Sequence, residues 1–183
     1  MSISMSRRRL LVAAGLALAP PALRAAAGSP ARTDARSARS LAFAHTHTGE
    51  RLCVTFAHGE TYIPAALGAL NHLLRDFRSN AEHPIDPALF DQLHALSAVT
   101  KSQAPFQIIS GYRSPATNTM LRKATGGVAS QSLHLTGQAI DVRLPDVPLA
   151  DLREAALSLR AGGVGFYPDS NFVHVDTGRV RRW

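Results

Sequence analysis

The fold of this chain is decided by the stretch Ser132-Leu-His-Leu-Thr-Gly-Gln-Ala-Ile-Asp-Val-Arg-Leu144. Apolar and polar residues alternate in its second half, a pattern typical of a strand with one buried face. Because successive strand side chains face opposite ways, the apolar residues would point into the core and Asp141 away from it. Gly137 suits a tight turn before the strand, since glycine tolerates backbone angles that other residues avoid. We therefore predict a strand that presents the Asp141 carboxylate to a cleft, with His134 on the turn at its start.

A second strand of the same kind is predicted downstream, at Phe172-Val-His-Val-Asp176. Its two valines would face the core and His174 the cleft, so His174 and Asp141 can meet if the strands are neighbours. Two imidazoles and one carboxylate can hold Zn²⁺, and three protein ligands leave a fourth position open for water, as in catalytic zinc sites. Each residue taken singly is more often an ordinary polar residue. The spacing between His134 and Asp141 alone leaves both interpretations open.

Four motifs follow one another along the chain: Ser110-Gly-Tyr-Arg-Ser114, Ser132-x-His134-x-x-Gly137-x-Ala139-x-Asp141, Gly163-Val-Gly-Phe-Tyr-Pro168 and Phe172-Val-His-Val-Asp-Thr-Gly178. Together they resemble the zinc D-Ala-D-Ala metallopeptidase superfamily, and within it the murein endopeptidase K group of peptidoglycan hydrolases. The resemblance extends from about Ser40 to Trp183. It implies a hedgehog-like α+β fold and a catalytic Zn²⁺ held by His134, Asp141 and His174.

The sequence defines the general base less clearly than the metal ligands. Several superfamily members carry Glu or Asp three residues before the last ligand His, whereas this chain has Asn171, which cannot titrate. Asp169, on the turn before the second strand, could reach the water as a base, or could simply bond its own backbone in a Pro-Asp turn. Asp176 shares a strand face with His174 and could orient its imidazole. We predict Asp169 and Asp176 as the catalytic carboxylates, the first as base and the second as the partner of His174.

Arg113 is the predicted substrate clamp. A guanidinium binds a carboxylate in a two-pronged geometry, and peptidoglycan stem peptides carry free carboxylates. The resemblance also implies an Arg at this position, although a Gly-Tyr-Arg turn can also carry an ordinary surface Arg. Ser132 is predicted to line the same cleft. His45 and His47 would share one strand face as a two-residue metal clip, but the resemblance implies no metal there.

These residues predict an exported zinc-dependent murein endopeptidase that hydrolyses peptide cross-links of the cell wall. They leave open whether the bond joins D-Ala to diaminopimelate or two diaminopimelates, and whether a D,D- or L,D-carboxypeptidase trims stem peptides instead. A non-catalytic zinc-bearing peptidoglycan-binding module, of the kind that hedgehog signalling domains exemplify, is favoured only by Asn171. Nucleic acid is not a predicted partner, because aromatic and basic residues do not interleave. The expected partner is the stem peptide, bound by a monomer.

The N-terminal residues predict export to the periplasm. Ser6-Arg-Arg-Arg-Leu-Leu11 resembles a twin-arginine signal, and the small residues Ala25-Ala-Ala27 suit signal-peptidase cleavage. The apolar run between them is too short for a permanent membrane span. Loss of residues 1–27, which contain four Arg and no acids, lowers the formal net charge from +7 to +3. We predict a signal peptide over 1–27, a flexible linker over 28–40 and a zinc peptidase domain over 41–183.

Apolar periodicity predicts a single domain of mixed helices and strands. Strands are expected as hairpins over 41–56 and 164–176 and singly over 106–109. Helices are expected over 63–78, from 87 to about 99, over 114–123 and over 149–160. Because helices and strands do not strictly alternate, we predict an α+β fold with an antiparallel sheet and helices packed around it. The single Cys53 is expected to be a buried thiol in a strand.

Overall fold

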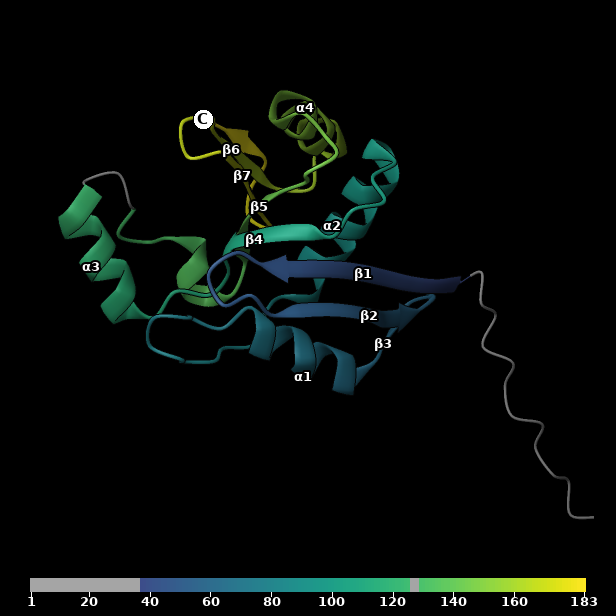
Figure 1. Ribbon diagram of the computed structural model, residues 1–183, viewed down its shortest axis with the longest axis horizontal. Helices are drawn as coiled ribbons and strands as arrows, with labels where there is room; N and C mark the ends of the chain where they lie inside the picture. Colours follow the sequence, from purple (N-terminus) through teal and green to yellow (C-terminus); the bar gives the residue numbers. More distant parts are fainter. Residues whose placement is uncertain (1–36, 126–128) are drawn as a thin grey trace, which may run out of the picture. The chain divides into compact units, whose positions relative to one another are not determined.

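Figure 1 shows the protein as a computed structural model that describes residues 37–125 and 129–183. The predicted signal peptide and residues 28–36 of the predicted linker lie outside the described residues. The helices are α1 (Pro64–Leu73), α2 (Pro87–Thr100), α3 (Pro115–Thr125) and α4 (Leu149–Leu159), with a short 3₁₀ helix η2 (Leu133–Thr136). The strands are β1 (Ala38–His45), β2 (Arg51–His58), β3 (Thr61–Tyr62), β4 (Phe106–Ser110), β5 (Ala139–Arg143), β6 (Gly163–Tyr167), β7 (Phe172–Asp176) and β8 (Arg181–Arg182).

The strands of the described residues form one sheet in the order β3-β2-β1-β4-β5-β7-β6-β8. The pairs β1–β4 and β6–β8 are parallel, and the other pairs are antiparallel. The predicted α+β class is confirmed, but the prediction of an antiparallel sheet is wrong, because the sheet is mixed. The chain passes through α1 and α2 before β4 lies beside β1, and such a crossover is what a parallel pair requires. Local sequence patterns do not predict that β4 pairs with β1.

Both predicted hairpins are present, as β1–β2 and β6–β7. The first strand begins at Ala38, so residues 38–40, predicted as the end of the linker, belong to β1. Strand β7 also pairs with β5, and this pairing is the one that builds the site. Its register places Asp141 directly opposite His174. The two strands are therefore the neighbours that the alternating pattern required.

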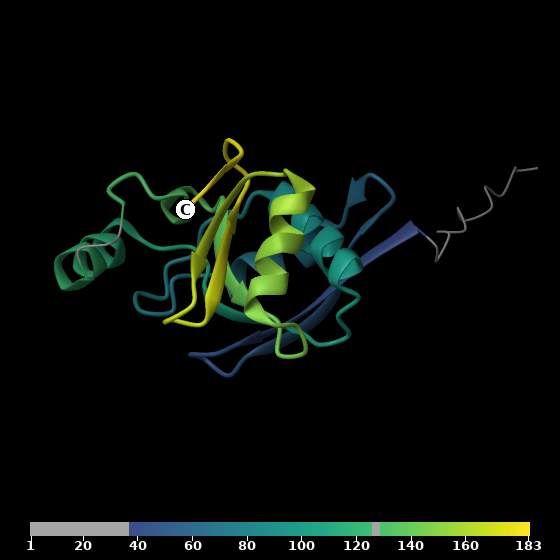
Figure 2. The same cartoon turned by 90° about the horizontal axis from the view of Figure 1, so that it is seen from above.

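Helices α2 and α4 contact each other and cover one face of the sheet (Figure 2). The core beneath them is made of fully buried aliphatic side chains, among them Leu89, Leu93, Leu96, Leu152, Ile140, Val142, Val173 and Val175. Because Val173 and Val175 face these helices, His174 between them must face the other side of the sheet. Burial of the valines, the main stabilising term at this position, thus also sets the direction of the histidine.

The turn before β5 holds His134 in place through two local features. Ser132 caps η2, since its side chain accepts a hydrogen bond from the backbone N–H of His134. Gly137 ends η2 with a left-handed φ of 68°, and a Cβ at this position would lie 2.2 Å from the carbonyl oxygen of Pro84. Only glycine fits both the backbone angle and the close approach. The predicted turn is therefore confirmed, with His134 on its helical part.

Two further sequence predictions are tested by the described residues. Cys53 is exposed on β2, so the prediction of a buried thiol is wrong. The apolar neighbours Leu52 and Val54 point the other way from Cys53, because strand residues alternate. No helix within residues 37–125 and 129–183 is long and apolar enough to cross a membrane.

Candidate metal centre

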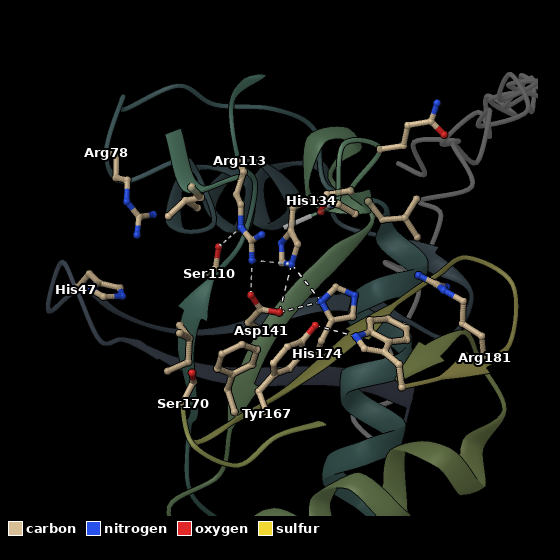
Figure 3. Close-up of a pocket in the computed structure, with 18 residues that line it drawn as sticks. His47, Arg78, Ser110, Arg113, His134, Asp141, Tyr167, Ser170, His174 and Arg181 are labelled. Atoms are coloured by element: carbon tan, nitrogen blue, oxygen red, sulfur yellow. Dashed lines mark hydrogen bonds and ion pairs between the residues drawn. The ribbon is translucent and has the colours of Figure 1, made fainter. Parts of the chain in front are cut away.

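His134, Asp141 and His174 converge on the face of the sheet opposite the covering helices (Figure 3). They come from η2, β5 and β7, and all three side chains are buried. Asp141 Oδ1 lies 3.2 Å from His134 Nε2 and 2.8 Å from His174 Nδ1, and the two nitrogens are 3.1 Å apart. The structure thus brings together the three residues predicted as metal ligands.

In each imidazole, the nitrogen that faces away from the cluster has a hydrogen-bond partner, and this partner determines which nitrogen carries the proton. His134 Nδ1 lies 2.7 Å from the carbonyl oxygen of Gly111, which can only accept, so Nδ1 carries the proton. His174 Nε2 lies 3.1 Å from Oδ2 of Asp176, which in its ionised form also only accepts. In the neutral rings, His134 Nε2 and His174 Nδ1 are therefore unprotonated. This is the arrangement in which metal-binding histidines are held by their second nitrogen.

The charges of the cluster favour the neutral form of His134 and a proton on His174. Burial lowers the pKa of His134, which keeps its imidazole neutral and able to bind a metal. Burial alone would raise the pKa of Asp141, but the neighbouring His134 and His174 hold it well below its usual range. For His174, burial would lower the pKa, whereas its hydrogen bonds with Asp141 and Asp176 outweigh burial and raise it. A proton on His174 would therefore compete with a metal ion, as at most histidine sites.

The donor set fits a divalent cation. Two nitrogen lone pairs and a carboxylate oxygen face one another at 2.8 to 3.2 Å, which is repulsive unless a proton or a cation lies among them. A point about 2 Å from all three atoms exists at these separations, and about 2 Å is the length of Zn–N and Zn–O bonds. Nitrogen and carboxylate ligands in this number are those of hydrolytic zinc sites. The cluster is open on the side of the pocket.

Asp176 is fully buried behind His174 and is held by four neighbours. Its Oδ1 accepts hydrogen bonds from the backbone N–H groups of Gly163 at 3.0 Å and Gly178 at 2.9 Å. Arg181 pairs with both oxygens, at 3.0 and 2.7 Å. Burial opposes ionisation, but the bonds to His174 and Arg181 lower the pKa of Asp176 well below its usual range. The structure therefore places Asp176 in contact with His174 on the side away from the cavity, which is the position that the predicted orienting role requires.

Arg113 lies at the cluster rather than at its rim. Its Nη2 donates to Asp141 Oδ2 at 2.5 Å and to His134 Nε2 at 3.1 Å, and its Nε donates to Ser110 Oγ at 2.9 Å. Since Arg has no acceptor, the contact with Nε2 agrees with an unprotonated nitrogen there. That nitrogen has one lone pair, so it binds either Arg113 or a metal. A guanidinium at this point can meet a substrate carboxylate beside the metal ligands.

The ligand cluster lies in a cavity of about 750 Å³, a size that accommodates small peptides. The predicted residues Arg113 and Ser132 line it, as does His47, which the sequence suggested only as part of a metal clip. Further lining residues that the sequence did not single out are Arg78, Tyr167, Ser170, Arg181 and Trp183. Asp169 is exposed on the turn between β6 and β7 and does not line the cavity. Among the lining residues that the structure describes, Asp141 is the only carboxylate. The structure does not bring the predicted base to the ligands.

A buried two-His, one-Asp cluster at the wall of a peptide-sized cavity defines the class of metal-dependent hydrolases. A family model described as peptidoglycan L,D-endopeptidase MepK matches residues 33–183. The chain belongs to this family of metal-dependent peptidases, and it is a peptidase.

Curated relatives extend over almost the whole chain. Peptidoglycan L,D-endopeptidase MepK of Escherichia coli strain K12 is 46% identical over 178 residues, covering 97% of this chain and 97% of the relative. The protein of the same name from Shigella flexneri gives the same values. The Haemophilus influenzae protein named probable peptidoglycan L,D-endopeptidase MepK is 42% identical over 173 residues, covering 94% of this chain and 90% of the relative. No solved structure matches the chain significantly.

Proposed function

We propose that this protein is an exported, zinc-dependent murein endopeptidase that hydrolyses L,D cross-links of peptidoglycan. One observation carries the proposal: three buried ligand atoms converge at the wall of a peptide-sized cavity in a chain of the MepK family. Hydrolysis of a peptide bond needs an activated water and a polarised carbonyl. The cluster has the donor set for the ion that provides both.

The bond follows from the chemistry that the relatives' name specifies, an L,D-endopeptidase. In a link between two diaminopimelates, the carbonyl belongs to an L centre and the amine to a D centre. A link from D-Ala to diaminopimelate joins two D centres. The diaminopimelate–diaminopimelate link is therefore the proposed substrate, in preference to the D-Ala link and to trimming of a terminal residue.

The roles of the side chains follow from their contacts. His134, Asp141 and His174 hold the ion, and bound Zn²⁺ would supply a Lewis acid that lowers the pKa of water and polarises the carbonyl. Asp176 keeps the His174 proton on Nε2, so that Nδ1 faces the site. Arg113 offers its guanidinium to a carboxylate next to the scissile bond. Asp169 does not line the cavity, so its position does not support its predicted role as the base.

Peptidoglycan as the substrate of the relatives agrees with a periplasmic location. Cleavage of residues 1–27 and passage through the twin-arginine pathway remain predictions from the sequence, as do the monomeric state and the lack of affinity for nucleic acid. Sequencing of the N-terminus of the protein recovered from the periplasm would locate the cleavage site.

The test uses purified protein and cross-linked muropeptide dimers of both types, with and without a chelator. The proposal expects cleavage of the diaminopimelate–diaminopimelate dimer that the chelator abolishes and Zn²⁺ restores. Asp141→Asn should lose this activity, whereas Asp91→Asn, a change in an ion pair with Arg39 outside the cavity, should retain it. Metal uptake without product from either dimer would favour the non-catalytic module instead.

A further inference from the structure

The cavity carries a second cationic group that the proposed chemistry does not use. Three arginines line it, and two of them are paired with acids: Arg113 with Asp141 and Arg181 with Asp176. Arg78 has no carboxylate within ion-pair distance among residues 37–125 and 129–183. Figure 3 shows Arg78 and His47 on the opposite side of the ligand cluster from Arg181.

The side chain of Arg78 rests on an aromatic support. Its guanidinium lies 4.2 Å from the centre of the Phe77 ring. Phe77 in turn stacks on His47, with ring centres 4.3 Å apart and planes at 11°, and meets His45 edge-on at 5.4 Å. Stacking on an aromatic ring occupies the flat face of a guanidinium and leaves its N–H edge available for a carboxylate. The Phe77 ring therefore orients the Arg78 guanidinium without neutralising its charge.

The buried carboxylate of Asp76 bonds the backbone at Arg78 and at Ser114, the residue after Arg113. Asp76 Oδ1 accepts from the backbone N–H of Arg78 at 3.0 Å, and Oδ2 accepts from the backbone N–H of Ser114 at 3.0 Å and its hydroxyl at 2.6 Å. Ser114 follows Arg113 in the chain. Burial and the nearby charge of Arg113 lower the pKa of Arg78, against the opposing effect of Asp76. Asp76 thus anchors the backbone at Arg78 and next to Arg113, and the two guanidiniums line one cavity, close enough for their charges to interact.

Two separated cations suit a ligand with two separated anionic groups. A cross-link between diaminopimelates carries free carboxylates at more than one point, one of them beside the scissile amide and another at the far end of the other diaminopimelate. We infer that Arg78 binds a second free carboxylate of the cross-linked stem peptide, remote from the scissile bond, and so selects substrates that carry it. This inference rests on the proposed function for the identity of the peptide, and Arg78 acts in binding and specificity, not in the bond cleavage.

The test compares Arg78→Gln with the wild type on three dimers: unmodified, amidated at the carboxylate beside the scissile amide, and amidated at the free carboxylate of the other diaminopimelate. On the unmodified dimer, Arg78→Gln should raise KM by about tenfold, the effect of losing one well-formed charged contact, with kcat changed less than about twofold. Amidation of the carboxylate remote from the scissile amide should raise the wild-type KM by a similar factor and leave the KM of Arg78→Gln unchanged. Arg51→Gln, an exposed arginine outside the cavity, is the matched control.

A binding measurement separates this inference from the proposed function. Trp183 is the only tryptophan of the chain and lines the cavity, so its fluorescence reports occupancy. A stem tripeptide ending in diaminopimelate has no cross-link to cleave, and Arg78→Gln should bind it about tenfold more weakly than the wild type. That result would support the inference even if no dimer were cleaved. Equal tripeptide affinity, or equal loss on all three dimers, would overturn it while leaving the endopeptidase activity intact.

Discussion

Replacement of Asp176 by Asn isolates the carboxylate that orients His174. In the folded protein Oδ2 accepts from His174 Nε2 and Arg181, and Oδ1 accepts from Arg181 and from two backbone N–H groups, those of Gly163 and Gly178. Asn has nearly the same size but a single acceptor oxygen. If that oxygen keeps the three donors at Oδ1, the amide NH₂ faces His174 Nε2. The imidazole must then carry its proton on Nδ1, the nitrogen that faces Asp141.

The magnitude follows from these contacts. Loss of a carboxylate that orients a ligand histidine weakens metal binding about 10- to 100-fold, equal to about 1.4 to 2.7 kcal/mol. Breaking a buried ion pair costs about 3 to 5 kcal/mol of stability. Because the Arg181 side chain is 31% exposed and remains partly solvated, we expect a loss of about 2 kcal/mol in the free energy of unfolding.

Zinc affinity is measured by competition with a chromogenic chelator, and stability by urea unfolding of the metal-free protein. Asp91→Asn, which alters the ion pair with Arg39 and the hydrogen bond from Tyr62, is the control that should leave zinc affinity unchanged. At saturating zinc, Asp176→Asn should recover much of its activity, as expected of an orienting residue. Zinc affinity equal to that of the wild type would refute the orienting role.

Three further variants test other parts of the structure. Asp169→Asn should change kcat/KM less than about threefold in a dimer-cleavage assay, because the carboxylate does not line the cavity; a loss above about a hundredfold would restore it as the base. Asp76→Asn should reduce the loss of unfolding free energy, measured with urea, that the wild type shows at acid pH. The bonds to Ser114 and Arg78 outweigh burial and lower the pKa of Asp76 in the folded protein. The contribution of its carboxylate to stability is therefore complete above the unfolded pKa of about 4 and is lost as the pH falls below it. A slope identical to that of the wild type would contradict this. Gly137→Ala should lower the free energy of unfolding by about 3 kcal/mol or more, and with it the melting temperature, because its Cβ would overlap a backbone carbonyl at a left-handed φ. An unchanged melting temperature would show that the turn can move.

The sequence predicts those features of the site that depend on interactions between residues close together in the chain. Strand alternation is enforced by burial of the valines on either side of His174, so the direction of the imidazole follows from the sequence. The turn at Gly137 is likewise local. The pairing of β5 with β7 is not local, but the family resemblance supplied it by requiring Asp141 and His174 to share one metal.

The features that sequence missed depend on the path of the chain between elements. The parallel pairing of β1 with β4 follows a crossover of two helices, and β8 is too short to show a pattern. Arg78 and Trp183 reach the cavity from segments that are far apart in sequence and irregular or very short. Cys53 is exposed although both of its neighbours are apolar, because alternation along β2 places Leu52 and Val54 on the opposite face.

The most direct test of the central claim is the zinc content of the purified chain and of three single variants, measured by elemental analysis after dialysis against buffered zinc. We expect one zinc per wild-type chain. His134→Gln, Asp141→Asn and His174→Gln should each retain less than about a tenth of an equivalent while remaining folded by circular dichroism, because the proposed centre uses all three side chains for the same ion. A folded variant that keeps a full equivalent of zinc would contradict the proposed metal centre.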